Sequence, residues 1–170
     1  MQVFQIKINK ENTLKIKGKN IYLRPLELND ANGNYQNWLN DPVVCKYNSH
    51  GHLLNTKKMT VDYINMANEL NSYKVFAICD NDTNKHIGNI SLQKISQENK
   101  SVEFAILIGE RAFMGNGVSK EVGKIILNYA FNVLRIDHVY CGTSEDNIPM
   151  QKLALHLKMI KEGVKVNEIF

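Results

Sequence analysis

Two glycines separated by one residue, Gly115 and Gly117, stand where an apolar strand pattern gives way to an apolar helix pattern. The strand pattern covers residues 102–108 and is rich in β-branched and aromatic side chains. Over residues 118–133, apolar side chains recur at steps of three and four, as on one face of an α-helix. A helix start carries backbone N–H groups without intrahelical partners and a partial positive charge. The glycine pair therefore indicates a place where a phosphate group can bind.

Two common phosphate-binding patterns do not fit this junction. A dinucleotide fingerprint needs a third glycine at the position of Lys120, and it normally follows an early strand. A P-loop needs a lysine directly after its second glycine, where this chain has Val118. The pair belongs to some other phosphate-binding turn, or it is a structural feature of the helix start.

Glu103 and Asn147 are the other residues whose type and position suggest chemistry. Glu103 is the one acidic residue of its apolar strand, so it is a candidate general base whose pKa partial burial would raise. A carboxylate that faces solvent in an alternating strand is the alternative. Asn147 lies thirty residues after Gly117 and can cap the last helix with its side-chain oxygen. Its amide NH2 group would then stay free for a ligand.

Length and composition limit what these residues can belong to. With 170 residues, 44% hydrophobic and 22% charged, the chain favours one soluble domain spanning residues 1–170. The three cysteines are far apart, which predicts no metal site and reduced thiols in a cytoplasmic protein. No signal-peptide or membrane-span pattern is present, so we expect no membrane partner. Apolar residues interrupt the lysines of residues 7–19, which favours a solvated edge over a nucleic-acid-binding arm.

The periodicity then predicts the elements that position the candidate residues. Residues 1–20 lack a clear period and predict an irregular strand or an arm. Helices are expected to begin near Asn29, Thr56, Gly115 and Asn147. Strands are expected over residues 21–26, 74–79, 86–92, 101–108 and 137–142. A crossover helix sets the last of these parallel to strand 101–108, while the three before it form an antiparallel meander. The fold class is α+β, with a mixed, mostly antiparallel sheet and helices on both faces.

The G-x-G turn at a helix start, the stretch Asn147-Ile148-Pro149-Met150 and the order of elements from Ile21 to Gly163 together resemble the GCN5-related N-acetyltransferase (GNAT) superfamily. The resemblance implies that acetyl-CoA is the co-substrate and that Glu103 is the base. It implies pantetheine contacts from Asn147 and from the splayed strand pair 101–108 and 137–142. The backbone groups implied in binding acetyl-CoA are those of Phe104, Ala105, Ile106, Leu107, Ile108, Met114, Gly115, Asn116, Gly117, Val118 and Ser119.

The chain departs from the family pattern at several positions. Ala112 stands where the family has glutamine or arginine, with Arg111 one place away. Ala154 replaces the tyrosine that serves many relatives as general acid, and Lys158 replaces a helix-end glycine. These departures keep open the alternative of a CoA-binding module without catalysis. The few residues after Gly163 predict a C-terminal sheet that is shortened or completed by a partner, and a homodimer is compatible with that.

The expected acceptor is a small amine. The stretch Trp38-Leu39-Asn40-Asp41-Pro42 with a following Tyr47 resembles the branch of ribosomal-protein-alanine and amino-sugar N-acetyltransferases. Tyr47 and His50 stand in a polar loop and are the expected ligand contacts of this segment. Trp38 is a further candidate for substrate contact, although core packing is favoured for it. The mildly basic chain favours an anionic, nucleotide-linked amino sugar over a protein N-terminus, which is the second candidate acceptor.

Overall fold

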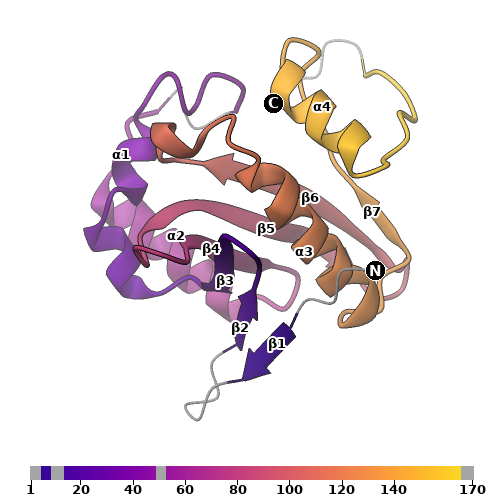
Figure 1. Ribbon diagram of the computed structural model, residues 1–170, viewed down its shortest axis with the longest axis horizontal. Coiled ribbons are helices and arrows are strands. Elements are labelled where there is room, and N and C mark those ends of the chain that lie inside the picture. The colour runs from indigo at the N-terminus through magenta and orange to yellow at the C-terminus, as the bar shows by residue number, and fades with distance from the viewer. Residues whose placement is uncertain (1–4, 9–13, 49–52, 166–170) are drawn as a thin grey trace.

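A seven-stranded mixed sheet organises the computed structural model, which describes residues 5–8, 14–48 and 53–165 (Figure 1). Its strands lie side by side in chain order. They are β1 (Gln5–Ile8), β2 (Leu14–Lys17), β3 (Ile21–Pro25), β4 (Lys74–Asp80), β5 (His86–Ser96), β6 (Ser101–Ile108) and β7 (His138–Tyr140). Every neighbouring pair is antiparallel except β6 and β7, which are parallel. The predicted fold class is confirmed, and the N-terminal strands β1 and β2 pair with each other in the sheet rather than forming an arm.

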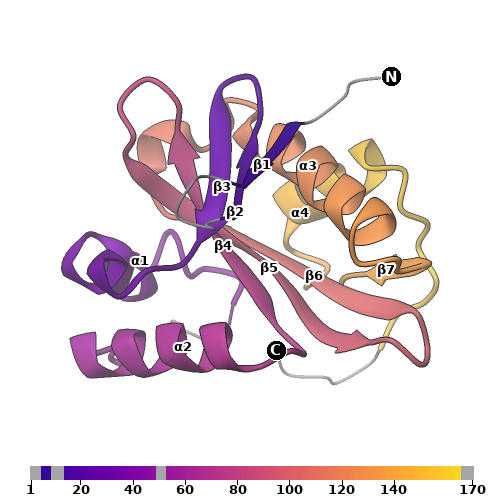
Figure 2. The same cartoon turned by 90° about the horizontal axis from the view of Figure 1, so that it is seen from below.

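Helices cover both faces of the sheet (Figure 2). The short η1 (Leu28–Asn32), α1 (Tyr35–Leu39) and α2 (Lys57–Glu69) lie on one face, and α3 (Val118–Asn132) with α4 (Ile148–His156) on the other. Alternate strand residues supply the two cores, as a pleated sheet requires. Val102 and Phe104 of β6 pack in the core beneath α3, whereas Leu107 packs in the core beneath α1 and α2. Glu103 therefore belongs to the face that α1 and α2 cover.

The first helical region differs from the single helix expected after Asn29. It consists of the 3-10 turn η1 and the separate short helix α1. Gly33 lies between them in an extended conformation, with φ −91° and ψ −153°, which interrupts the helical hydrogen bonds. The Asp30 side chain accepts the backbone N–H of Glu27 at 2.8 Å and so closes η1.

The parallel pair of strands parts soon after it begins. The last paired residues are Glu103 of β6 and Tyr140 of β7, so residues 104–108 of β6 have β5 on one side only. Peptide groups of a strand alternate between its two neighbours. The Gly109 N–H donates to Ile87 O on β5, and Ala105 O lies toward Ser91 of β5. Hence the peptide groups of Phe104 and Ile106 point toward the opening between the strands, as the predicted splay requires.

Two further expectations concern the C-terminal residues and the absence of a membrane span. Residues 160–165 form no helix or strand, and residues 166–170, which complete the stretch after Gly163, lie outside the described residues. Whether the C-terminal sheet is shortened or completed by a partner stays a prediction. None of the helices in the described ranges has both the length and the apolar character that crossing a membrane requires.

Candidate functional site

The glycine turn is open and needs glycine for its backbone conformation. Gly115 has φ +78° and Gly117 has φ +83°, values at which a side chain is strained. A Cβ atom placed on either glycine would meet no other atom within 4 Å. The turn follows the 3-10 element η3 (Arg111–Phe113), and Asn116 Nδ2 steadies it by donating to Ala112 O at 2.7 Å. The turn therefore has open space around it, and its backbone holds two residues in the left-handed conformation.

The first turn of α3 offers unpaired donors to that space. Gly117 is the N-cap residue, and because glycine has no side chain, no capping oxygen takes up the first N–H groups of the helix. The first amides that bond back to Gly117 O are those of Lys120 and Glu121, at 3.1 and 3.2 Å, so the N–H groups of Val118 and Ser119 precede the helical ladder. The acidic residue of this turn, Glu121, accepts two hydrogen bonds from Asn20 at 2.9 and 2.8 Å. The residues present fit a phosphate group bound at the start of a fifteen-residue helix.

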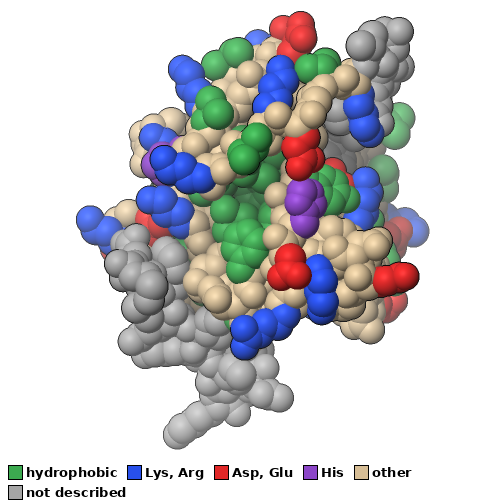
Figure 3. Space-filling model, turned by 90° about the vertical axis from the view of Figure 1, so that its right-hand side faces the viewer, with side chains coloured by type: hydrophobic (Ala, Val, Ile, Leu, Met, Phe, Trp, Pro, Cys, Tyr) green, Lys and Arg blue, Asp and Glu red, His purple; other side chains and the backbone are tan. Residues whose placement is uncertain are grey.

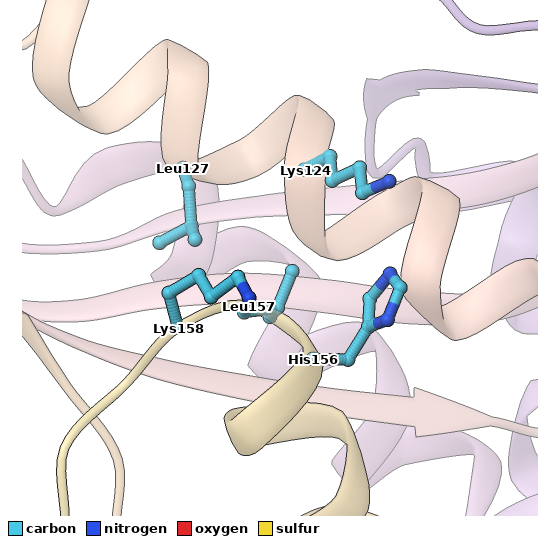
Figure 4. Close-up of a pocket in the computed structure, with 5 residues that line it drawn as sticks. All are labelled: Lys124, Leu127, His156, Leu157 and Lys158. Carbon is cyan, nitrogen blue, oxygen red and sulfur yellow. The ribbon is translucent and has the colours of Figure 1, made fainter.

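A basic pocket lies farther along α3, against the end of α4 (Figure 4). It measures about 470 Å³ and is lined by Lys124, Leu127, His156, Leu157 and Lys158. Partial desolvation and the positive charges of Lys124, Lys120 and Lys158 lower the pKa of His156. The space-filling view of the molecule's right-hand side shows hydrophobic side chains in a central hollow, bordered by a histidine and by charges of both signs (Figure 3). A phosphorylated ligand in the pocket between α3 and α4 would lie beside the positive charges of Lys124 and Lys158.

Glu103 lies at the point where β6 and β7 part. It is opposite Gln93 of β5 and level with Tyr140 of β7. Its side chain is 23% exposed, and its Oε2 atom is buried. The ammonium group of Lys94, 2.7 Å from Oε2, provides the compensating charge. The structure therefore brings the candidate base together with the opening that residues 104–108 border.

Helix α4 has the expected cap from Asn147 and shows how the chain does without the helix-end glycine. Asn147 Oδ1 accepts the Met150 N–H at 3.2 Å, which caps α4 and leaves Nδ2 without a partner among the described residues. Lys158 has φ +65° at the end of α4. The Met159 N–H donates to Ala154 O and the Lys158 N–H donates to Leu155 O, the two bonds of a Schellman motif. Lysine thus occupies a left-handed position that normally favours glycine.

The three residues predicted to contact the acceptor are placed differently. Trp38 is 5% exposed, packs over Gly109 and donates from Nε1 to Glu110 Oε1 at 3.2 Å. Tyr47 is half-buried in the turn that follows α1. His50 lies outside the described residues. The indole is therefore part of the packing between α1 and the sheet, and acceptor contact by any of the three stays a prediction.

A buried charged network behind this region was not predicted from the sequence. Arg24 donates two hydrogen bonds to Asp30, at 2.8 and 2.6 Å, and His86 Nδ1 lies 3.3 Å from the same carboxylate. Burial alone opposes ionisation of Asp30, yet the hydrogen bonds from Arg24 and His86 hold its pKa well below the usual range. His86 packs edge-on against Trp38, with ring centroids 4.9 Å apart. The network joins β3, η1 and β5 under α1.

Metal ligands are not among these features. Within residues 5–8, 14–48 and 53–165, no group of three His, Cys, Asp or Glu side chains could hold a metal ion. Cys45, Cys79 and Cys141 are all free thiols, and burial raises the pKa of each. Protonated thiols are poor nucleophiles, so these cysteines are structural.

Comparison with known proteins identifies the family that shares this arrangement. Residues 20–160 match the family model described as Acetyltransferase (GNAT) domain. The chain is 24% identical over 166 residues to a Bacillus subtilis (strain 168) protein named "Probable N-acetyltransferase YjcK", and the match covers 91% of each.

Solved structures with low sequence identity share the fold. Spermidine N-acetyltransferase from Vibrio cholerae, in complex with CoA and spermine, superposes with a TM-score of 0.79 at 22% identity, covering 90% of this chain and 88% of the other. A GNAT-family acetyltransferase from Bacillus anthracis gives a TM-score of 0.76 at 19% identity, covering 88% and 85%.

Proposed function

Since the chain belongs to the acetyltransferase (GNAT) domain family, we propose that it transfers an acetyl group from acetyl-CoA to the primary amine of a small molecule. The observation that carries this proposal is that the open glycine turn and the gap between β6 and β7 lie along the same stretch of chain. The open glycine turn at the start of α3 follows β6 by way of the short η3, and the free edge of β6, residues 104–108, begins next to Glu103. One long ligand can therefore bind phosphate at one end and present its other end to a carboxylate.

The described residues give each part of acetyl-CoA a partner in this proposal. The N–H groups around Gly115, Gly117 and Ser119 hold the pyrophosphate, supported by the partial charge of α3. The peptide groups of Phe104 and Ile106 and the free Nδ2 of Asn147 bond the pantetheine amides. The basic pocket lined by Lys124, His156 and Lys158 receives the phosphorylated adenosine end.

The reaction needs little more from the protein than position and a base. Acetyl-CoA supplies the acetyl group as an activated thioester. Glu103 accepts the proton of the acceptor ammonium, so that a neutral amine forms beside the opening between β6 and β7. A peptide N–H of residues 104–108 stabilises the negative charge that develops on the carbonyl oxygen. Because α4 has Ala154 where relatives have a phenol, solvent protonates the departing thiolate.

The acceptor is the less defined partner. The Vibrio cholerae neighbour was solved with spermine, which shows that this fold can bind a small amine in that protein. The mild positive charge of the present chain still favours an anionic acceptor such as a nucleotide-linked amino sugar. Both acceptor classes carry a primary amine, which is the group that Glu103 needs.

Two measurements test the proposal in sequence. A thermal shift with millimolar acetyl-CoA is expected, since a ligand far above its Kd adds several kcal/mol of stability. Release of free thiol is then followed with polyamines, amino sugars, nucleotide-linked amino sugars and N-terminal peptides. Glu103→Gln is expected to lower kcat at least about a hundredfold, whereas Glu98→Gln in an exposed turn leaves it unchanged. No thermal shift contradicts the CoA site, and a shift without turnover supports a non-catalytic CoA-binding module.

A further inference from the structure

A β-bulge places Lys94 on the same face of the sheet as Glu103. Gln93 pairs with Glu103 and Ser96 pairs with Ser101, so Lys94 and Ile95 together oppose Val102. In an unbroken strand, Lys94 would point to the face opposite Gln93. At the bulge it adopts φ +51°, while Ile95 takes the place beside the buried Val102 in the core under α3. The extra residue leaves the lysine free to reach the carboxylate.

The backbone conformation of Lys94 is costly for a residue with a side chain. Left-handed residues at such bulges are usually glycine, and a lysine there is strained. Strain of this kind is retained where a local arrangement serves a purpose. Here the arrangement delivers an ammonium group on a flexible chain of methylenes, 65% exposed, to the buried Oε2 atom of Glu103.

The surroundings of the Lys94 ammonium are those that an acceptor amine requires. The hydrogen bond and charge of Glu103 raise the pKa of Lys94, with smaller contributions from Tyr140 and Tyr73. A base must lie within about 2.6–3.2 Å of the group whose proton it takes, and Lys94 Nζ lies 2.7 Å away. The lysine is thus a primary alkylammonium already located beside the proposed base.

From this geometry we infer that Lys94 is a resident stand-in for the acceptor, which binds by displacing its ammonium group from Glu103, and that the acceptor is itself a primary alkylamine. The inference rests on the proposed function and adds a competitor built into the chain. It replaces the amino sugar, which only the net charge of +4 favours, by an alkylamine, because the contact between Lys94 and Glu103 is local to the proposed base. The Lys94 side chain leaves the carboxylate by rotating its own flexible chain toward solvent. An acceptor that approaches on an unbranched alkyl chain fills the same path.

The variants Lys94→Gly and Lys100→Gly form a matched pair. Lys100 also has a left-handed backbone, with φ +50°, but its Nζ faces Gln97 in an exposed turn. Glycine relieves the same strain at both positions, so neither variant is expected to fail to fold. With saturating acetyl-CoA and n-butylamine as acceptor, Lys94→Gly should lower the KM for the amine about threefold to fivefold. Lys100→Gly should leave that KM unchanged.

A second readout does not depend on turnover. The methylene carbon next to the Lys94 ammonium is observed by NMR of protein labelled with ¹³C-lysine, and Lys94→Arg assigns its signal. Excess n-butylamine should move this signal toward its position in Glu103→Gln, where the ion pair is absent. Glucosamine at the same concentration should move it less.

The outcomes separate this inference from the proposed function. Turnover with an unchanged or raised KM in Lys94→Gly contradicts the stand-in role and leaves the proposed function intact. An effect of glucosamine equal to that of n-butylamine contradicts the alkylamine class. If no amine of any class is acetylated, the proposed function fails, and the Lys94 signal alone then decides whether an amine displaces the lysine.

Discussion

Arg111 and Asp41 form a two-point ion pair that joins the turn before the glycine pair to the end of α1. Arg111 Nε donates to Asp41 Oδ2 at 2.9 Å, and Nη2 donates to Oδ1. This bond lowers the pKa of Asp41. The arginine nearest to the family's basic position therefore contacts the loop that follows α1 and not the glycine turn. The segment proposed to bind the donor and the segment expected to contact the acceptor are linked directly.

Removing this ion pair should weaken acceptor binding more than donor binding. We expect Arg111→Ala and Asp41→Asn each to raise the KM for the amine about twofold to fourfold, because both release the same loop. The double variant should resemble either single one, since one interaction is lost in all three. Steady-state kinetics with each substrate varied in turn measures this. A large rise in the KM for acetyl-CoA in Arg111→Ala alone would assign the arginine to the pyrophosphate.

Gly117→Ala should destabilise the fold and weaken the binding of acetyl-CoA together. A side chain at φ +83° costs about 1 kcal/mol, although nothing within 4 Å would clash with it. Relaxation of this strain would turn the N–H groups of Val118 and Ser119 away from the ligand. Urea unfolding and calorimetric titration with CoA give the two values. Gly163→Ala, in open space without a left-handed backbone, is the control and should change neither.

Lys158→Gly should make the protein more stable. Glycine adopts the left-handed conformation at the end of α4 without strain, which we expect to add about 0.5–1 kcal/mol to the free energy of unfolding. Lys158→Ala keeps the strain and removes only the charge. Urea unfolding without ligand compares the two variants with the wild type. Equal stability of the glycine and alanine variants would mean that the lysine conformation carries no cost.

Asp30→Asn should cost about 3 kcal/mol at pH 7, since it removes the nearest counter-charge of the partly buried Arg24 guanidinium and leaves only the more distant Glu27. The folded-state pKa of Asp30 lies below its unfolded value, so the carboxylate stabilises the fold fully above about pH 4. That contribution falls as the pH drops toward the folded-state pKa. The stability gap between wild type and variant should therefore narrow at pH 3 relative to pH 7.

Urea unfolding at the two pH values measures this gap. Asp82→Asn, in an exposed turn, serves as the matched control and should be neutral at both. A gap that widened at pH 3 would contradict the ion pair as its source.

Local pattern was sufficient to predict most of the elements but few of the side-chain partnerships. The period of 3.6 predicted a helix over residues 115–132, and α3 spans Val118–Asn132. Strand 101–108 was predicted with its full bounds. By contrast, Asp41 and Arg111 are 70 positions apart, and nothing in either segment specifies the other. Long-range pairs of this kind depend on how the layers pack.

Lys94 shows a different limit of the sequence. Strict alternation along 86–96 would separate it from Glu103, and only the bulge brings the two together. A bulge with a lysine in the left-handed region carries no glycine to mark it. The Schellman end of α4 escaped prediction for the same reason, because Lys158 stands where glycine is the usual signal.

The early parting of β6 and β7 also bears on whether another chain can pair with the sheet. Unpaired strand edges invite pairing with other chains, and proteins normally protect them at the margin of a sheet. Here the free edge of residues 104–108 faces the gap that opens where β7 ends at Tyr140, and α3 packs against the same part of the sheet. A foreign strand would have to enter that gap lengthwise, whereas a single flexible chain of methylenes and amides can thread it. The position of this edge inside the sheet therefore favours pairing with a thin ligand over pairing with another polypeptide.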